Sequence, residues 1–152
     1  MKHLLIIISF LFLSYPVIGD SKKRDTLYRW GEYPDYVWKG FGKKETNPKY
    51  RGHVENGVPK GLGILIYPKG NKYEGGWNNG EMNGRGTETF SNGDKYEGEY
   101  KDGLPNGKGT ETWSDGNKYV GEYKDDFPWN GKEFDKKGNI QYKIVNGKWI
   151  KQ

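Results

Sequence analysis

The chain has no cysteine among its 152 residues. This absence excludes disulfide bonds, thiolate zinc sites and a cysteine nucleophile, although it does not fix the compartment. Aliphatic residues are also scarce, because all hydrophobic residues together make up 32% of the chain and aromatic residues make up 16%. Together with 24 glycines, this composition argues against a thick aliphatic core. It favours a thin sheet whose apolar surface is supplied by aromatic rings.

The chain also lacks long blocks of one charge. The formal net charge is +5, and lysines are interspersed with glutamates. A nucleic-acid-binding surface needs Lys and Arg clustered on one face, so we expect no nucleic-acid partner. Solubility is a sufficient explanation of the mild positive charge.

The one long apolar run lies at the N-terminus. A short basic start precedes apolar residues over 4–13, and Pro16 then ends any helix. This pattern is typical of a secretory signal peptide covering residues 1–19, with cleavage near Gly19–Asp20. The alternative is an uncleaved membrane anchor, but a spanning helix needs about 20 apolar residues. We therefore predict an exported protein of the cell envelope, periplasmic or extracellular.

From residue 50 onward the sequence repeats with a period of 23 residues. Tyrosines open consecutive units at Tyr50, Tyr73, Tyr96 and Tyr119. In each unit a glycine follows two positions later, and an aromatic or branched apolar residue follows four positions later. A fixed period of this length indicates stacked structural units.

Within a unit, residue types alternate as in β-strands. In residues 96–101, tyrosine and glycine occupy one face of the strand and charged residues the other. Turn signals such as Asn79–Gly80 and Asp102–Gly103 separate the strands, because these residues adopt positive φ readily. Each unit is therefore predicted to be one β-hairpin. The predicted fold is all-β: an elongated, single-layer antiparallel meander of stacked β-hairpins. The units cover residues 50–72, 73–95 and 96–118, with a degenerate fourth unit at 119–134.

Two flanks lack the repeat. Residues 20–48 are rich in aromatic residues and are predicted to cap the first edge of the array, because open sheet edges invite aggregation. Residues 135–152 are predicted to form an irregular capping hairpin around Asn146–Gly147. In the fourth unit the turn at residues 125–131 looks longer than in the others. This places Glu133 where the second glycine of a Gly-x-Gly is expected.

The recurring rings are the candidate binding surface. Strands ~4.8 Å apart place equivalent residues of successive units ~10 Å apart, so the rings form rows. Glycines between the rings leave room for a ring of the neighbouring strand. A surplus of rings over what a thin sheet can bury suggests an aromatic groove that receives a partner. The predicted groove consists of Tyr50, Tyr67, Tyr73, Trp77, Phe90, Tyr96, Tyr100, Trp113, Tyr119 and Tyr123. The repeat glycines are Gly52, Gly61, Gly63, Gly75, Gly84, Gly86, Gly98, Gly107, Gly109 and Gly121.

Two segments carry a family resemblance. Tyr-Glu-Gly-Glu-Tyr-Lys-Asp-Gly at 96–103, followed by Asn-Gly-Lys-Gly-Thr at 106–110, resembles the MORN repeat. The segments at 73–80 and 83–87 resemble it equally, whereas the first unit departs at Val54 and the fourth loses a glycine. The resemblance implies an elongated sheet of stacked hairpins with a groove lined by aromatics. It also implies a scaffold, binding or membrane-associated role without catalysis.

No arrangement of residues in the sequence indicates chemistry. His53 is the one histidine after the predicted leader, and alternation places it on the face opposite Tyr50 as a solvated strand residue. Glu88 and Glu111 fall on the aromatic face, but ~10 Å apart they are slightly wide for a glycosidase pair. Single acids in the turns do not supply the converging oxygens that calcium requires. We expect no enzyme activity, no cofactor and no metal site.

The function favoured by these observations is a non-catalytic binding or scaffold protein of the bacterial envelope. Its aromatic groove or a sheet edge would contact a protein partner or a second copy. One alternative is association with membrane lipid, although residues 22–24 carry fewer cations than the four to eight typical of anionic-lipid recognition. Another is glycan binding, with sugars stacked on the aromatic ladder. In the plainest alternative the rings serve only as the core.

Overall fold

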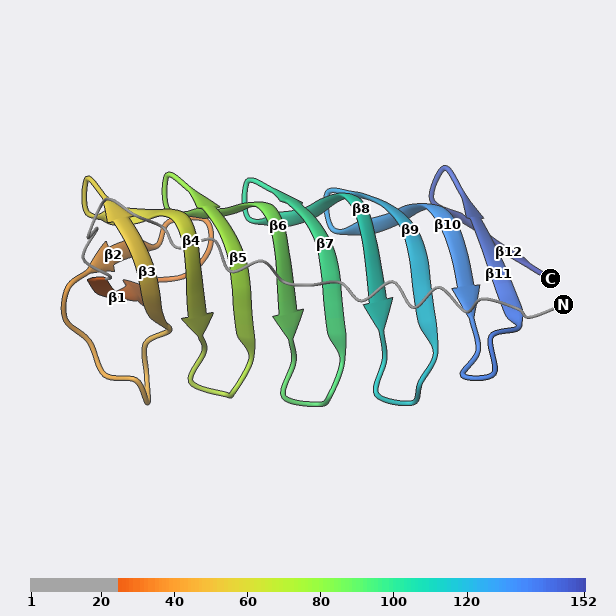
Figure 1. Ribbon diagram of the computed structural model, residues 1–152, viewed down its shortest axis with the longest axis horizontal. Helices are drawn as coiled ribbons and strands as arrows, with labels where there is room; N and C mark the ends of the chain where they lie inside the picture. Colours follow the sequence, from red (N-terminus) through yellow and green to blue (C-terminus); the bar gives the residue numbers. More distant parts are fainter. Residues whose placement is uncertain (1–24) are drawn as a thin grey trace, which may run out of the picture.

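The computed structural model describes residues 25–152, which form one open antiparallel sheet of 12 strands (Figure 1). None of these residues forms a helix, and therefore none forms one that could cross a membrane. The predicted all-β, single-layer meander of hairpins is confirmed. The predicted signal peptide lies outside the described residues. The strands are β1 (Asp25–Trp30), β2 (Val37–Lys39), β3 (Lys49–Glu55), β4 (Val58–Ile66), β5 (Lys72–Asn78), β6 (Glu81–Thr89), β7 (Lys95–Lys101), β8 (Leu104–Thr112), β9 (Lys118–Lys124), β10 (Phe127–Phe134), β11 (Ile140–Val145) and β12 (Lys148–Lys151).

The order of strands follows the chain over most of the sheet. From β3 to β12 each strand pairs with the next, and the ribbon in Figure 1 runs from one end of an elongated array to the other. The N-terminal strands depart from this order, because β1 pairs with β3 and β2 pairs with β1. The aromatic flank therefore extends the sheet beyond the first repeat, and β2 forms that edge.

Tight turns join the two strands of each unit. Asn56, Asn79 and Asp102 have φ values of 52°, 49° and 50°, and the glycine after each also has positive φ. Two successive residues with positive φ are the requirement of the hairpin turn that matches strand twist. The fourth turn differs, because Asp126 occupies the glycine position with a φ of 73°.

Turns at the opposite end of the hairpins link one unit to the next. The backbone N–H of Ser91 donates to Asn71 Oδ1 at 3.0 Å, and that of Ser114 donates to Asp94 Oδ1 at 2.8 Å. The bond from Ser114, together with one from the Asn92 side chain, lowers the pKa of the Asp94 carboxyl. Each unit therefore positions the loop of its successor through a side chain at a fixed phase of the repeat.

A row of glycines crosses the middle of the sheet. Gly75 pairs with Gly63 on one side and with Gly86 on the other, and glycine opposes glycine in every pair from Gly52 in β3 to Gly131 in β10. Most repeat glycines of the prediction belong to this row. The repeat period therefore aligns one kind of residue across eight consecutive strands, β3 to β10.

The fourth unit is shorter than predicted, not longer. Gly131 pairs with Gly121, and Glu133 pairs with Tyr119. The prediction that Glu133 replaces a repeat glycine is therefore wrong. The cause is the bulge of β10, where Trp129 alone interrupts the register, whereas β6 and β8 place more residues there.

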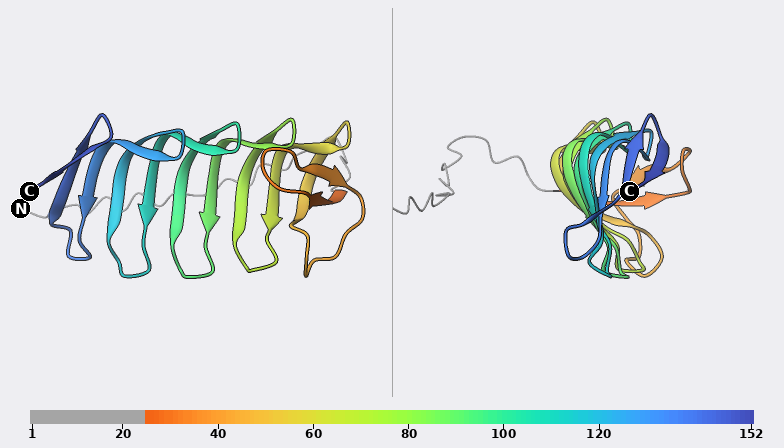
Figure 2. Two further views of the ribbon diagram at one scale, coloured as in Figure 1. Left: turned by 180° about the vertical axis from the view of Figure 1, so that it is seen from behind. Right: turned by 90° about the vertical axis from the view of Figure 1, so that its right-hand side faces the viewer.

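Register shifts beside the glycine row bend each hairpin. Gly61, Gly84 and Gly107 lie in these bulges with φ values of 74°, 81° and 103°. A bulge bends its strand and increases the twist, and seen end-on the strands in Figure 2 arch around one side of the sheet. We call the concave face, which carries Tyr73, the inner face. The opposite face, which carries residues such as Lys72, is the outer face.

The core lies against the inner face and consists mainly of rings. A single sheet would leave both faces in water. The bulges, however, fold the end of each hairpin that carries its tight turn over the tyrosines that open the units, Tyr50, Tyr73, Tyr96 and Tyr119. The flank strands β1 and β2 lie on the same concave side in Figure 2. The buried hydrophobic residues are Leu27, Tyr50, Leu65, Tyr73, Trp77, Met82, Tyr96, Tyr100, Tyr119, Tyr123 and Ile144.

Candidate functional site

The rings predicted to line a groove form a continuous chain of edge-to-face contacts. The Tyr73 ring centroid lies 5.3 Å from that of Trp77 in its own unit and 5.0 Å from that of Tyr100 in the next. The same alternation continues from Tyr100 through Tyr96 and Tyr123 to Tyr119. Such pairs contribute about 0.5–1.5 kcal/mol each beyond area burial. The rings therefore join the repeats to one another.

Each tyrosine of the first row lies along its own strand. The Tyr73 hydroxyl donates to the Gly76 carbonyl at 2.9 Å, and Tyr50, Tyr96 and Tyr119 make the equivalent bond three residues ahead. The ring therefore covers the glycine of its own strand as well as the glycine of the following strand. The prediction had placed over each glycine only a ring from the neighbouring strand. A Cβ on Gly86 would lie 2.5 Å from Tyr73 Cε2, so the ring requires glycine there.

Burial leaves most of these rings without a free face. The two central rows are the first row (Tyr50, Tyr73, Tyr96 and Tyr119) and the second row (Trp77, Tyr100 and Tyr123). Tyr50, Tyr73 and Tyr119 are fully buried, and the largest exposed fraction in the two rows is 5%, at Tyr123. The remaining predicted groove residues, Tyr67, Phe90 and Trp113, are half-buried at the rim of the inner face. The expected surplus of unburied rings is therefore absent from these two rows.

Burial also changes the acidity of the ring hydroxyls. It raises the pKa of Tyr50 to about 12. It raises the pKa of Tyr73 and Tyr96 further, with nearby carboxylates adding to the effect. These hydroxyls stay protonated at any physiological pH, so they serve as hydrogen-bond donors and not as bases.

Carboxylates alternate with the tyrosines of the first row. Glu88 pairs with Tyr73 on one side and Tyr96 on the other, at the position that Leu65 occupies in the first unit. The Tyr100 hydroxyl donates to Glu88 Oε2 at 3.3 Å. Burial raises the pKa of the Glu88 carboxyl. The structure thus places Glu88 on the aromatic face, as predicted, but bonds it to a tyrosine.

Glu111 repeats this arrangement one unit later. Its Oε2 accepts from the Tyr123 hydroxyl at 3.1 Å, and its Oε1 accepts from Trp113 Nε1 at 3.2 Å. Glu88 and Glu111 therefore each accept hydrogen bonds from aromatic side chains that lie next to them. The arrangement orders the rings around the two carboxylates.

The N-terminal flank completes the ring chain at the first unit. Val54 stands where later units carry a ring, so Tyr50 has no edge-to-face partner from its own unit. Trp38 of β2 supplies one, with its centroid 5.8 Å from that of Tyr50 and 5.8 Å from that of Trp77. Trp38 Nε1 also donates to the Gly80 carbonyl at 3.2 Å. The sequence analysis identified the aromatic flank, but it did not predict that Trp38 takes the place of the ring that is missing at Val54.

A small cavity of about 190 Å³ lies between the flank and the repeats. The Arg29 guanidinium lies over the rings of Tyr36 and Tyr67, at 4.7 and 5.0 Å from their centroids. The Tyr36 hydroxyl donates to Glu81 Oε2 at 2.6 Å, and this pair closes another side of the cavity. These contacts fasten the flank to the first unit through Tyr67 and to the second unit through Glu81.

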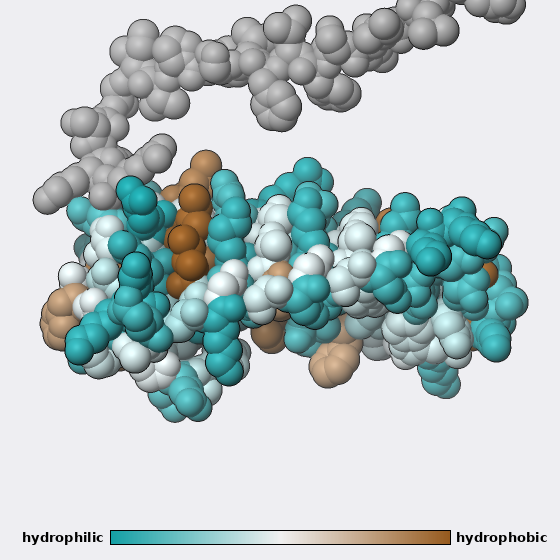
Figure 3. All heavy atoms as spheres, turned by 90° about the horizontal axis from the view of Figure 1, so that it is seen from below, coloured by the Kyte–Doolittle hydropathy of each residue, from teal (hydrophilic) through white to brown (hydrophobic). Residues whose placement is uncertain are grey.

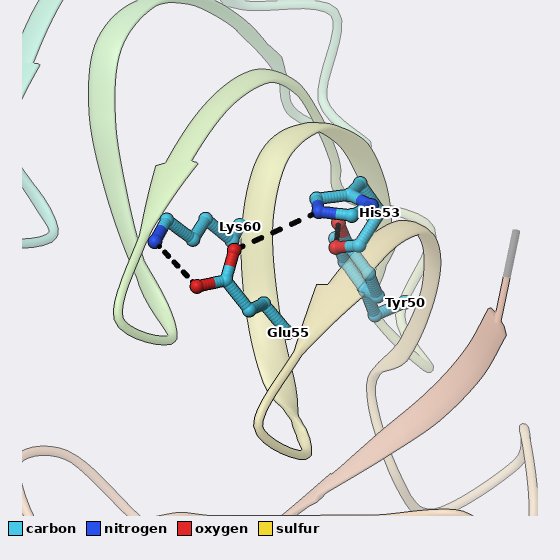
Figure 4. A network of polar contacts seen from close by, with 4 residues as sticks. All are labelled: Tyr50, His53, Glu55 and Lys60. Carbon is cyan, nitrogen blue, oxygen red and sulfur yellow. Dashed lines mark hydrogen bonds and ion pairs between the residues drawn. The ribbon is translucent and has the colours of Figure 1, made fainter. Parts of the chain in front are cut away.

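His53 lies in the bulge of the first unit (Figure 4). Its carbonyl accepts the Tyr50 hydroxyl at 2.7 Å, and its Nε2 lies 4.0 Å from Glu55 Oε2. Lys60 Nζ donates to Glu55 Oε1 at 2.8 Å. Within residues 25–152 no hydrogen bond reaches the buried Nδ1 of His53. The network holds the ion pair of Glu55 and Lys60 at the bend of the first hairpin.

Metal binding finds no support in the part of the chain that the structure describes. No group of three or more His, Asp or Glu side chains in residues 25–152 could hold an ion.

The outer face carries charged residues in rows. Lys72 Nζ lies 3.2 Å from Glu74 Oε2, and Lys95 Nζ lies 3.0 Å from Glu97 Oε2. Cations outnumber carboxylates on the paired positions of this face. The cations include Lys49, Arg51, Lys72, Arg85, Lys95, Lys101, Lys108, Lys118, Lys124 and Lys132, and the carboxylates include Glu55, Glu74, Glu97, Glu99 and Glu122.

An aliphatic stripe interrupts these charges on β4. Leu62, Ile64 and Ile66 alternate along the strand on the outer face, and Leu62 is 78% exposed. Figure 3 shows a hydrophobic column whose immediate surroundings are mostly hydrophilic. The sequence analysis missed this stripe, because it followed only the alternate residues that share a face with the tyrosines. Comparison of the other face between units would have found it.

Both edges of the sheet are short. β2 has three residues and β12 has four, and all residues of β12 are exposed. Lys148 and Lys151 lie at the two ends of β12. Short edge strands bearing lysine resist addition of a further strand, because like charges would meet across the new pair.

Comparison with known proteins concerns the central part of the chain. A family model for the MORN repeat matches residues 50–72, 73–95 and 96–118. The predicted fourth unit at residues 119–134 is not part of the match. A search of curated proteins found no match for the chain. Residues 50–118 are therefore similar to three consecutive MORN repeats, a non-enzymatic repeat generally associated with membrane or protein binding.

Proposed function

We propose that these MORN repeats form a non-catalytic binding scaffold whose outer face contacts a protein partner. The observation that carries the proposal is the distribution of exposed surface. The two central ring rows of the inner face are buried, and the edge strands are short. The outer face is the extended surface that remains, and it presents both charged rows and an aliphatic stripe.

The chemistry of the outer face suits a protein better than a polyanion. Carboxylates such as Glu74 and Glu97 lie within the cationic rows and would repel a uniformly negative partner. A protein surface can present both signs, and complementary charges favour fast and selective association. Leu62, Ile64 and Ile66 form one apolar patch among charged residues, and such a polar-rimmed patch is typical of a contact site.

Charge reversal on the outer face tests the proposal. Proteins from an envelope extract are captured on the immobilised chain, and the retained protein is purified for a titration. Lys95→Glu with Lys118→Glu should weaken its binding by about tenfold or more, equivalent to ~1.4 kcal/mol. Lys136→Glu with Lys137→Glu is the matched control, because these residues lie in the turn after β10 and should leave binding unchanged. Equal retention by all three forms would contradict the proposal.

Membrane association is the second candidate, favoured by the excess of cations over carboxylates on the outer face. Each cation near an anionic surface contributes about 1 kcal/mol of attraction at low salt. Flotation with vesicles containing phosphatidylserine should then succeed at low salt and fail at high salt. Vesicles without anionic lipid serve as the control, and no flotation at low salt removes this candidate.

We further propose that the chain acts after export, because residues 1–19 have the pattern of a signal peptide. Sequencing of the mature N-terminus should find cleavage near Asp20, and a mature protein that begins at Met1 would contradict export by this route. Glycan stacking on the aromatic ladder is not part of the proposal, because the two central rows are buried.

A further inference from the structure

The aliphatic stripe of β4 is not required by the hairpin fold. Ile64 and Ile66 are replaced by Thr87 and Thr89 at the equivalent positions of the second unit, and by threonines again in the third. The strands pair in the same register in all three units. Yet Ile66 is 45% exposed and Leu62 is 78% exposed. Because the same hairpin forms with polar residues there, the fold does not need the stripe, and its exposed side chains are available for contact with another surface.

Opposite charges flank the stripe, and they do so only at this unit. Ile64 pairs with Arg51 on β3 and with Glu74 on β5. The equivalent Thr87 has glutamates on both sides, Glu74 and Glu97. The surface around Ile64 is therefore positive on one side and negative on the other.

We infer that a second copy of this chain docks on the stripe, about a twofold axis parallel to β4. Such an axis lays stripe on stripe and exchanges the two sides, so Arg51 of each copy faces Glu74 of the other. An axis perpendicular to β4 in the plane of the sheet would instead place Arg51 on Arg51. Twofold contacts need a self-complementary patch, and this patch meets that condition in one orientation. The inference rests on the proposed role of the outer face in binding.

The shape of the patch fits the same arrangement. A hollow of about 480 Å³ lies beside the stripe, lined by Leu62, Ile64, Ile66 and the adjoining glycines. Facing sheets pack ~10 Å apart with interdigitating side chains, so the aliphatic groups of each copy can enter the hollow of the other.

Two features limit the strength of the contact. Lys49 and Lys72 both flank Ile66, so like charges meet at that end, although Lys72 is already paired with Glu74 at 3.2 Å. The stripe covers one strand of a convex surface, which puts the contact in the small class below ~1,200 Å². The dimer is therefore weak and forms at high protein concentration.

Sedimentation velocity over a concentration series tests the inference with the whole exported chain. The wild type should show a monomer–dimer equilibrium. Ile64→Thr with Ile66→Thr installs the residues of units two and three, so the fold is retained, and it should weaken dimerisation at least about tenfold. A wild type that is monomeric at its highest soluble concentration would overturn the inference, as would a dimer that this variant leaves unchanged.

Charge variants test the twofold arrangement itself. Arg51→Glu and Glu74→Arg should each weaken self-association by about tenfold, because like charges then face each other. An equal mixture of these two variants should form heterodimers, since every facing pair again has opposite signs. Glu97→Arg, on the same face one unit away, is the matched control and should dimerise as the wild type does. Failure of the mixture to associate would overturn the inference.

The two proposals fail separately. Loss of dimerisation with partner binding intact removes only the self-association. Absence of partner binding with the dimer intact removes only the proposed partner scaffold.

Discussion

The two faces of this sheet are made by alternate residues of the same strands, yet they obey different constraints. Tyr96 is 4% exposed and belongs to the ring chain, while its neighbours Lys95 and Glu97 form an ion pair in solvent. The inner row repeats tyrosine in every unit, whereas the corresponding outer row changes from Arg51 to Glu74, Glu97 and Val120. Stability resides in the repeated face, and any selectivity for partners resides in the variable one.

Substitution of adjacent residues on opposite faces should show the largest difference. Tyr96→Ala removes a ring that contacts Tyr100 and Tyr123 at 5.2 and 5.0 Å, and it should lower the free energy of unfolding by about 3–5 kcal/mol. Lys95→Ala removes only a solvent-exposed ion pair and should change it by less than about 0.5 kcal/mol. Urea unfolding followed by fluorescence measures both, and similar losses would break the contrast between the faces.

The glycine row should show the next largest effect. A Cβ at Gly86 would lie 2.5 Å from Cε2 and from the hydroxyl oxygen of Tyr73, and that side chain is fully buried. Gly86→Ala should therefore cost about 3 kcal/mol through overpacking. Thr87→Ala, the next residue on the outer face, is the control and should cost less than about 1 kcal/mol. Thermal unfolding compares the two variants. A Gly86→Ala protein as stable as the wild type would mean that the Tyr73 ring does not require a residue without a Cβ at position 86.

High pH should destabilise the inner face. Burial raises the pKa of Tyr50, Tyr73 and Tyr96 above the value of about 10 that unfolded tyrosine has. Stability from these protonated hydroxyls is complete below about pH 10 and falls above it, by about 1.4 kcal/mol per pH unit for each such tyrosine. Urea midpoints should fall together with the appearance of tyrosinate absorbance. A midpoint that stays constant about one unit above pH 10 would contradict this.

Much of the fold could be predicted from the sequence because its signals are local and repeated. Strand alternation, Asn-Gly turns and the repeat period each constrain neighbouring residues, and they agree on one meander. The same alternation placed Tyr73 and Glu88 on one face, as the structure has them.

The candidate site was harder to predict because burial depends on how the sheet bends. Alternation separates two faces but does not tell which one curves inward. That is decided by bulges at residues such as Gly84, and it buries rings that a flat sheet would expose. The bulge at Trp129 and the contact of Trp38 with Tyr50 depend on single non-periodic residues. A repeat pattern carries no information about those positions.

Glu88 offers the finest test of the contrast, because it is a carboxylate on the ring-bearing face. Burial raises its pKa, so the ionised form costs stability at neutral pH; the cost shrinks as the pH falls below that raised pKa and is gone below the ordinary value of 4.5. Glu88→Gln keeps an acceptor for the Tyr100 hydroxyl without the charge. It should therefore unfold at slightly higher urea than the wild type at neutral pH, and at the same urea once Glu88 is protonated in both the folded and the unfolded state. Glu97→Gln on the outer face should change stability by less than about 0.5 kcal/mol at neutral pH. A Glu88→Gln protein less stable than the wild type at neutral pH would mean that the carboxylate gains more from its tyrosine bond than it loses by burial.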